Sequence, residues 1–263
     1  MTVAEPAIHR AADRLWEADQ TLVPCPPIRD LIEEQDVESA YAIQRINIDR
    51  QLALGRRISG WKIGITSRAA QQQLGVDMPN CGALFADTEY GHGSTIPFSR
   101  TMQPRVEAEI ALVLGEDIDQ EFPTISDVVR ATSFVIASLE VVGCRLKDWD
   151  IRIADIVADN SAASLYVLGS TPRSLIGMDM ASAAMTMRRN GKLAAASHGS
   201  DPLGHPLTSA AWLARTLAGF GAPLRAGDTI LTGALGPIVE AHPGDKFEAA
   251  IEGLGTVTAV FSK

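Results

Sequence analysis

Three glutamates in two apolar segments are the residues of this sequence best suited to chemistry. Between residues 105 and 114, polar and apolar residues alternate as in a β-strand, which places Glu107 and Glu109 on one face. Their side chains would lie about 7 Å apart, close enough for both carboxylates to reach one cation. Glu140 is the single acid of a second apolar segment, residues 134–142, where an uncompensated charge is costly. Three carboxylates without histidine or thiolate suit a hard cation, so we expect Mg²⁺ or Mn²⁺ here.

The same spacing also fits a plainer structural interpretation. Alternating glutamates are common on the solvated face of a strand, and Glu140 could simply end its strand. Spacing alone does not separate the two interpretations. Only the apolar surroundings of Glu140 favour the metal site.

Lys62 is the cation best placed to assist such a site. It stands between Gly60 and Gly64 on one face of an alternating strand, so the two missing side chains would leave a hollow around its ammonium group. Beside three carboxylates the charged form is favoured, which indicates a permanent cation that pairs with a carboxylate or donates a proton. The alternative is an ordinary exposed lysine.

Polar side chains also occur in a predicted turn and directly before a predicted helix. Asp159, Asn160 and Ser161 follow one another among small residues, which suits a turn that faces a substrate; a simple Asx turn fits equally well. His205 precedes a predicted helix, where it either packs at the helix start or acts as a general base.

The loop TGALG begins with Thr232 and Gly233, directly after a short apolar strand. Its backbone could approach a ligand closely or merely turn a corner. The loop lacks a P-loop lysine and the GxGxxG spacing, so nucleotide binding has no support. The chain also lacks a Gly-x-Ser-x-Gly elbow, which argues against a covalent hydrolase.

These candidates belong to a strand-rich body that follows a helical portion. Helical spacing predicts one helix around residues 8–16 and a second that buries Val37, Tyr41, Ile48 and Leu52. Strands are expected near residues 58–65, 82–86, 106–114, 134–142, 184–188, 229–233 and 247–261, with a hairpin at 190–191, a short helix from 67 to 73 and a longer one at 208–219. Strands and helices do not alternate regularly, so we predict an α+β fold.

Bulk composition excludes several classes of function. The net charge is −9, and the densest basic cluster is only Arg56-Arg57, which argues against nucleic acid and anionic membranes as partners. Neither a run of about 20 apolar residues nor a signal-peptide core is visible. The three cysteines are scattered and suggest neither disulfides nor a zinc site. We therefore expect a cytoplasmic protein that acts on a small molecule.

Six segments resemble the 2-hydroxypenta-2,4-dienoate hydratase family, also called 2-keto-4-pentenoate hydratases. They are QPRVEAEIALVL, LEVVGCRLKDW, VADNSA, LGHPL, ILTGALGP and PGDKFEAAIEGLGTV, and the similarity runs from about Trp61 to Lys263. That family belongs to the fumarylacetoacetase-like superfamily. The resemblance therefore implies a helical N-terminal subdomain, residues 1–57, followed by a mixed β-roll body, residues 58–263. Cys144 departs from the serine expected there.

The resemblance also implies a reaction and a set of roles. The reaction is hydration of 2-hydroxypenta-2,4-dienoate, or a C5-substituted analogue, to 4-hydroxy-2-oxopentanoate in meta-cleavage catabolism of aromatic compounds. It assigns the metal to the three glutamates and a substrate-pairing or proton-delivering role to Lys62. Asp159 and His205 remain unranked candidates for activating water. The expected substrate contacts are Ile63, Leu84, Asn160, Ser161, Thr232 and Gly233. Relatives of this kind form ring-like homo-oligomers, which implies a pentamer or decamer that could associate with the next enzyme of its pathway.

Three other functions compete with this one. A 2-oxo-3-hexenedioate (4-oxalocrotonate) decarboxylase would share the metal site and would need a cation for a second carboxylate, for which Arg145 is available. A C–C hydrolase of the superfamily is less consistent with the TGALG loop. A non-catalytic partner subunit of a decarboxylase would have no need of three clustered acids.

Overall fold

The computed structural model describes residues 5–263, in which a helical segment precedes a body of two sheets. The helices are α1 (Glu5–Thr21), α2 (Val37–Ala53), α3 (Arg68–Leu74), α4 (Ile125–Ala131), α5 (Ile153–Ala158) and α6 (Pro206–Gly219). The strands are β1 (Ile58–Gly64), β2 (Asn80–Phe85), β3 (Glu89–Gly91), β4 (Thr95–Ile96), β5 (Arg105–Leu114), β6 (Thr132–Val142), β7 (Leu165–Leu168), β8 (Ala184–Arg189), β9 (Lys192–His198), β10 (Thr229–Leu231), β11 (Val239–Glu240), β12 (Lys246–Ile251) and β13 (Gly255–Phe261).

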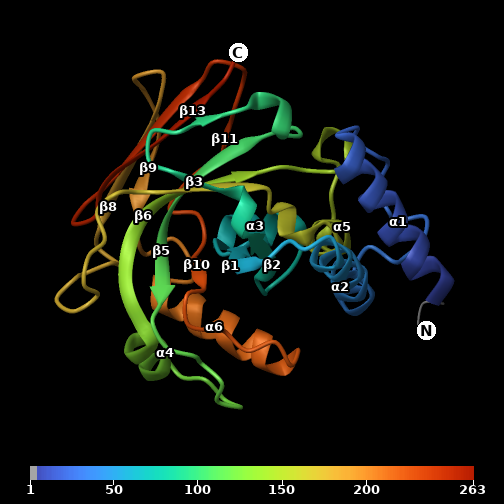
Figure 1. The fold of residues 1–263 in the computed structure, drawn as a ribbon, viewed down its shortest axis with the longest axis horizontal. Helices are drawn as coiled ribbons and strands as arrows, with labels where there is room; N and C mark the ends of the chain where they lie inside the picture. The colour runs from blue at the N-terminus through green and yellow to red at the C-terminus, as the bar shows by residue number, and fades with distance from the viewer. Residues whose placement is uncertain (1–4) are drawn as a thin grey trace.

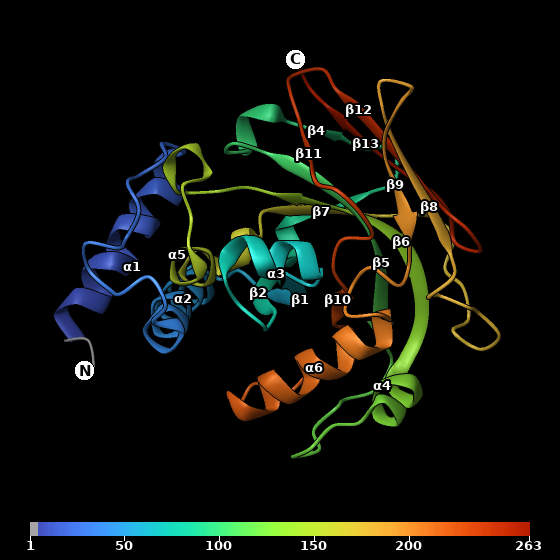
Figure 2. The same cartoon turned by 180° about the vertical axis from the view of Figure 1, so that it is seen from behind.

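The larger sheet is strongly curved and has the strand order β2-β1-β10-β5-β6-β7-β3, with β11 paired to one end of β5. The smaller sheet has the order β4-β13-β12-β8-β9. It lies on the side of the molecule away from α1, α2 and α5, while α4 and α6 lie together at one end of β5 and β6 (Figures 1 and 2). This arrangement confirms the predicted α+β fold with a curled β-roll body.

The two faces of β5 explain how the acids are held. Val106, Ala108, Ile110 and Leu112 alternate along one face and are buried in the main core. That core also contains apolar residues of the smaller sheet and of α6. The opposite face of β5 is therefore left to line the concave side of the curved sheet. Side chains alternate between the two faces of β5, as the sequence predicted, so the core lies on one face and the candidate site on the other.

The N-terminal helices have a second apolar core of their own. Ala11, Ala12 and Leu15 of α1 pack in it with Ile43 of α2. Ile28, Ile32 and Ala40 also belong to this core, and residues 144–158, which include α5, complete it. The helical segment is thus bound to the body through α5, and the boundary at residue 57 stays a prediction.

The buried stripe of α2 differs from the predicted one. Leu52 is 41% exposed, whereas Gln44 is buried and donates to the carbonyl oxygens of Cys81 and Val157. Burying the Gln44 amide costs little free energy, because its N–H groups have two acceptors. The buried face of α2 therefore includes a polar residue and leaves Leu52 outside. Short elements such as α4, α5 and β7 were not predicted. No helix within residues 5–263 is both long and apolar enough to cross a membrane.

Candidate metal centre and active site

Three carboxylates meet on the concave face of β5 and β6. Glu107 pairs directly with Glu140 across the two antiparallel strands, and Glu109 follows two residues along β5, opposite Ser138. One carboxylate oxygen from each glutamate lies within 4.8 Å of the corresponding oxygens of the other two. Side chains opposite each other in adjacent strands share a face, so the register of the strands brings the three acids together.

Two of the three acids are fully buried, and three of their four carboxylate oxygens accept no hydrogen bond from the described residues. Glu109 and Glu140 are fully buried, and Glu109 Oε1 and both oxygens of Glu140 accept no hydrogen bond from any residue in 5–263. Burial raises the pKa of Glu107 and Glu109, and raises that of Glu140 to about 7. Orphaned carboxylate oxygens are costly unless an ion offsets their charge. The donor set therefore fits a hard divalent cation.

Glu109 is oriented by the loop that follows β10. The backbone N–H of Gly233 donates to Glu109 Oε2 at 2.8 Å, and the Thr232 hydroxyl donates to the Ile110 carbonyl oxygen at 2.8 Å. Gly233 has a φ of 106°, and a Cβ there would overlap the Thr66 side chain. A glycine is therefore required at this position. The Gly233 N–H thus positions the Glu109 carboxylate, and the Thr232 hydroxyl bonds the loop to β5. The predicted substrate contacts of Thr232 and Gly233 stay a prediction.

Lys62 reaches the acids from β1. Its ammonium lies 3.3 Å from Glu140 Oε2 and donates to the Ser161 carbonyl oxygen at 2.9 Å. Burial alone would lower the pKa of Lys62, but the nearby carboxylates, Glu140 first, raise it overall. Lys62 is thus a buried cation that donates one hydrogen bond, to Ser161, and pairs with Glu140 by charge, so it keeps an N–H donor for a ligand.

Asn80 is a candidate that sequence reasoning missed. It is opposite Gly64 in the β1–β2 pair and is almost fully buried. Its Oδ1 accepts from the Ser161 hydroxyl at 2.9 Å, whereas its Nδ2 has no acceptor among the described residues. A Cβ on Gly64 would overlap Asn80 Oδ1 and lie 3.4 Å from Lys62 Nζ. Gly64 thus makes room for this polar cluster. The signal in the sequence was faint, because it depends on the register of β2.

The predicted turn at residues 159–162 is present and unusual. Asn160, Ser161 and Ala162 all have positive φ, between 52° and 56°. The Asn160 amide pairs with both backbone groups of Ala83, at 2.8 and 2.9 Å. Asn160 therefore fixes the turn to β2, while Ser161 faces Lys62 and Asn80.

Asp159 and His205 are placed differently from what a water-activating base requires. Both Asp159 oxygens accept hydrogen bonds from Arg145, and burial raises the pKa of this carboxyl to about 6. His205 is the N-cap of α6, where its Nδ1 accepts from Leu207 N at 3.0 Å. The neutral ring therefore carries its proton on Nε2 and cannot accept one there. Neither placement supports the predicted role.

The two apolar candidates lie on opposite faces of the sheet. Leu84 is on the same face as Lys62 and packs with Ala111 and Leu231 beside the acids. The Ile63 side chain points the other way, into the main core. The structure therefore places Leu84 on the face that carries the acids and the Ile63 side chain on the opposite one.

Comparison with known proteins gives one family throughout. Residues 59–262 match the fumarylacetoacetate (FAA) hydrolase C-terminal family. The chain is 49% identical to the TodF product hydratase of Pseudomonas putida strain F1, over 98% of this chain and 96% of that one. It is also 49% identical to the 2-keto-4-pentenoate hydratase of Paraburkholderia xenovorans strain LB400, over 96% and 94%. The structure of the 4-oxalocrotonate decarboxylase from Pseudomonas putida G7, complexed with magnesium and adipate, superimposes with a TM-score of 0.93 at 30% identity, covering 99% of each chain.

Proposed function

The chain belongs to the fumarylacetoacetate hydrolase family, and we propose that it is a hydro-lyase that converts 2-hydroxypenta-2,4-dienoate, the enol form of 2-keto-4-pentenoate, to 4-hydroxy-2-oxopentanoate. The single observation that carries this proposal is the cluster of Glu107, Glu109 and Glu140, in which the unbonded oxygens of Glu109 and Glu140 fit a divalent cation. The similarity to hydratases over nearly the full chain supports the reaction type.

The three glutamates would hold Mg²⁺ or Mn²⁺, as the magnesium complex of the related decarboxylase suggests. A divalent cation bound there supplies an electrophile for the C1 carboxylate and C2 oxygen of a 2-oxo acid, which lowers the cost of negative charge at C2. The partial exposure of Glu107, beside two fully buried acids, indicates the side from which a ligand enters.

Lys62 and Asn80 supply the hydrogen-bond donors beside the acids. The available N–H of Lys62 is suited to pairing with a substrate oxygen or to protonating the dienol carbon C5. The free Nδ2 of Asn80 is suited to donating to a second substrate oxygen, since a buried donor without an acceptor is otherwise costly. As C5 gains a proton, the enol O–H proton is lost from the C2 oxygen and replaces the one that Lys62 gave. The hydroxyl of water then adds at C4 and the remaining proton of water at C3, so the net change is the addition of one water molecule. Leu84 would pack against the carbon chain on the same face.

The competing decarboxylase reading requires a cation for a second carboxylate. Arg145, the candidate from the sequence, is 8% exposed and directs its side-chain hydrogen bonds to Asp159 and Ala163. It is therefore not available for a substrate carboxylate, which favours the hydratase.

An ultraviolet assay tests the proposal. With Mg²⁺ or Mn²⁺ present, the protein should consume the dienol absorbance of 2-hydroxypenta-2,4-dienoate, and a chelator should stop the reaction. With 2-oxo-3-hexenedioate, no CO₂ should be released. Release of CO₂, together with an unchanged dienol signal, would reject the hydratase in favour of the decarboxylase.

A further inference from the structure

We propose that Arg145 is a positioning residue that clamps the turn at residues 160–162 and thereby fixes Lys62 in the active site. Arg145 hydrogen-bonds none of the three acids; its effect passes through the backbone of the turn. The inference rests on the proposed function, because one of its readouts is hydratase turnover.

The turn needs an external support. Three consecutive non-glycine residues with positive φ form a conformation that L-amino acids adopt as single residues and rarely as a run. Such backbone persists only where surrounding contacts over-determine it, and it gathers at functional sites. We therefore expect that contacts from neighbouring residues hold the turn in this conformation, and that the conformation serves the active site.

Arg145 hydrogen-bonds to the residues on both sides of the turn. Its Nε and backbone N–H donate to the two oxygens of the Asp159 carboxylate, and its Nη2 donates to the Asp159 carbonyl oxygen at 2.6 Å. Its Nη1 donates to the Ala163 carbonyl oxygen at 3.1 Å. Asp159 and Ala163 are the residues directly before and after the positive-φ run. One planar guanidinium thus ties the start of the turn to its end, which a lysine ammonium could not do in the same geometry.

Ser161 is the residue of the turn that contacts the active site. The Ser161 carbonyl oxygen accepts from Lys62 Nζ, and the Ser161 hydroxyl donates to Asn80, both at 2.9 Å. Ser161 is therefore the contact between the clamp and both donors of the active site. If the turn relaxed, Lys62 would lose the acceptor that aims its ammonium, while the three acids on β5 and β6 would stay in place.

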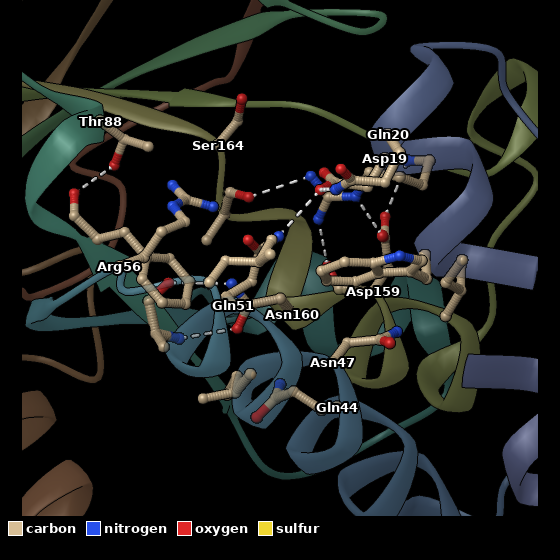
Figure 3. A pocket seen from close by; sticks show the side chains of 18 of the residues that line it. Asp19, Gln20, Gln44, Asn47, Gln51, Arg56, Thr88, Asp159, Asn160 and Ser164 are labelled. Atoms are coloured by element: carbon tan, nitrogen blue, oxygen red, sulfur yellow. Dashed lines mark hydrogen bonds and ion pairs between the residues drawn. The ribbon is translucent and has the colours of Figure 1, made fainter. Parts of the chain in front are cut away.

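The clamp also faces a cavity on the other side of the turn. This cavity, of about 370 Å³, lies between α1, α2 and the end of β2, and its walls include Asp19, Gln51, Arg145, Asp159 and Asn160 (Figure 3). A small cation could enter it and occupy the place of a missing guanidinium. This access makes chemical rescue a direct test.

The experiment compares Arg145→Ala with the parent enzyme and with a matched control, Arg189→Ala. Arg189 on β8 also bridges to a buried aspartate, Asp245, at 2.7 Å, but it lies in the smaller sheet. We expect Arg145→Ala to lower kcat by about 10- to 100-fold, as small misplacements of reacting groups do, with Mn²⁺ affinity unchanged. Millimolar guanidinium should restore part of the kcat lost in Arg145→Ala. It should not change the kcat of Arg189→Ala.

A second readout does not depend on activity. Backbone amide exchange should speed up at Ala163 and Gly143, whose N–H groups bond to carbonyl oxygens of the turn. Exchange along β5 should stay as in the parent. If Arg145→Ala does not fold, Arg145→Lys takes its place in both readouts, because lysine keeps the charge beside Asp159 but cannot bridge to Ala163.

Several results would contradict the proposed role of Arg145. They are an unchanged kcat in the folded variant, a loss of Mn²⁺ affinity in step with kcat, an equal loss in Arg189→Ala, or unchanged amide exchange in the turn. A parent enzyme that is inactive on the dienoate would instead reject the proposed function, and the exchange measurement would still decide whether Arg145 holds the turn.

Discussion

Glu107 and Glu140 face each other directly across β5 and β6, so two acids that are far apart in the chain become nearest neighbours in the sheet. Like charges directly opposite each other destabilise a strand pair. Glu140 is fully buried and Glu107 is partly buried, and Glu109 beside them adds a third negative charge. The fold therefore accepts a local electrostatic cost at this one place, and a bound divalent cation would remove it.

Glu109→Gln tests the cation directly, since the change removes a ligand charge and keeps the side-chain shape. Turnover should be abolished with the fold intact. Loss of an outer-shell partner costs about 10- to 100-fold in metal affinity, and loss of a direct ligand should exceed that. Calorimetric titration with Mn²⁺ measures the effect. Glu116→Gln, at an exposed position just after β5, should behave as the parent. Near-normal activity in Glu109→Gln would refute the ligand set.

Lys62→Met tests the buried ammonium. Because the acids would lose a neighbouring positive charge that competes with the metal, Mn²⁺ affinity should stay the same or increase. The kcat should fall by about 10²- to 10³-fold, as expected when one preorganised donor is lost. Steady-state kinetics and metal titration on the same preparation separate the two effects. Lys192→Met on the exposed edge of β9 is the control. A variant with parental kcat would show that Lys62 takes no part in the reaction.

Gly64→Ala tests the polar cluster of Lys62, Asn80 and Ser161. The added methyl group would overlap Asn80 Oδ1 and lie 2.7 Å from Ser161 Oγ, so it should displace both and reduce turnover. The matched change is Gly219→Ala at the exposed end of α6, where nothing lies within 4 Å of the new Cβ. That control should be neutral or stabilising by up to about 1 kcal/mol. Equal kinetics in the two variants would argue against a role for the cluster.

The pH dependence of stability should differ between metal-free and metal-bound protein. Burial raises the pKa of Glu140 to about 7, and it also raises those of Glu107 and Glu109. Between the unfolded pKa of about 4.3 and these values, the metal-free native state holds protons that the unfolded chain has lost. Its free energy of unfolding should therefore fall as pH rises through this window.

Saturating Mg²⁺ should reverse that trend, because metal binds the deprotonated acids and gains affinity as pH rises. Thermal unfolding across the same pH range, with chelator and with Mg²⁺, measures both slopes. Glu140→Gln should flatten the slope seen with chelator. Two identical profiles would show that the acids do not bind the added ion.

The sequence predicted the parts of the site that follow from local periodicity. The alternation along β5 separated Glu107 and Glu109 from the core face. Of the two glycines beside Lys62, Gly64 does make room for the polar cluster, whereas a Cβ on Gly60 would meet the backbone of Thr229. The pairing of Glu107 with Glu140 was not predictable, since it depends on the register of two strands separated by α4. Asn80 was missed for the same reason, because its role arises from the β1–β2 register.

Other errors came from contacts between distant segments. The buried face of α2 was predicted with Leu52 inside, but Gln44 takes part in it by bonding to β2 and α5. Asp159 was an unranked candidate for activating water, and its carboxylate accepts hydrogen bonds from Arg145, three residues after β6. In both cases a polar residue is satisfied by a partner that local patterns do not reveal.

The most direct test of the metal centre is anomalous X-ray scattering from crystals grown with Mn²⁺. We expect one strong peak between the carboxylates of Glu107, Glu109 and Glu140, in reach of all three. A fully Mn²⁺-loaded, active protein whose peak lies elsewhere, with these three acids free of metal, would contradict it.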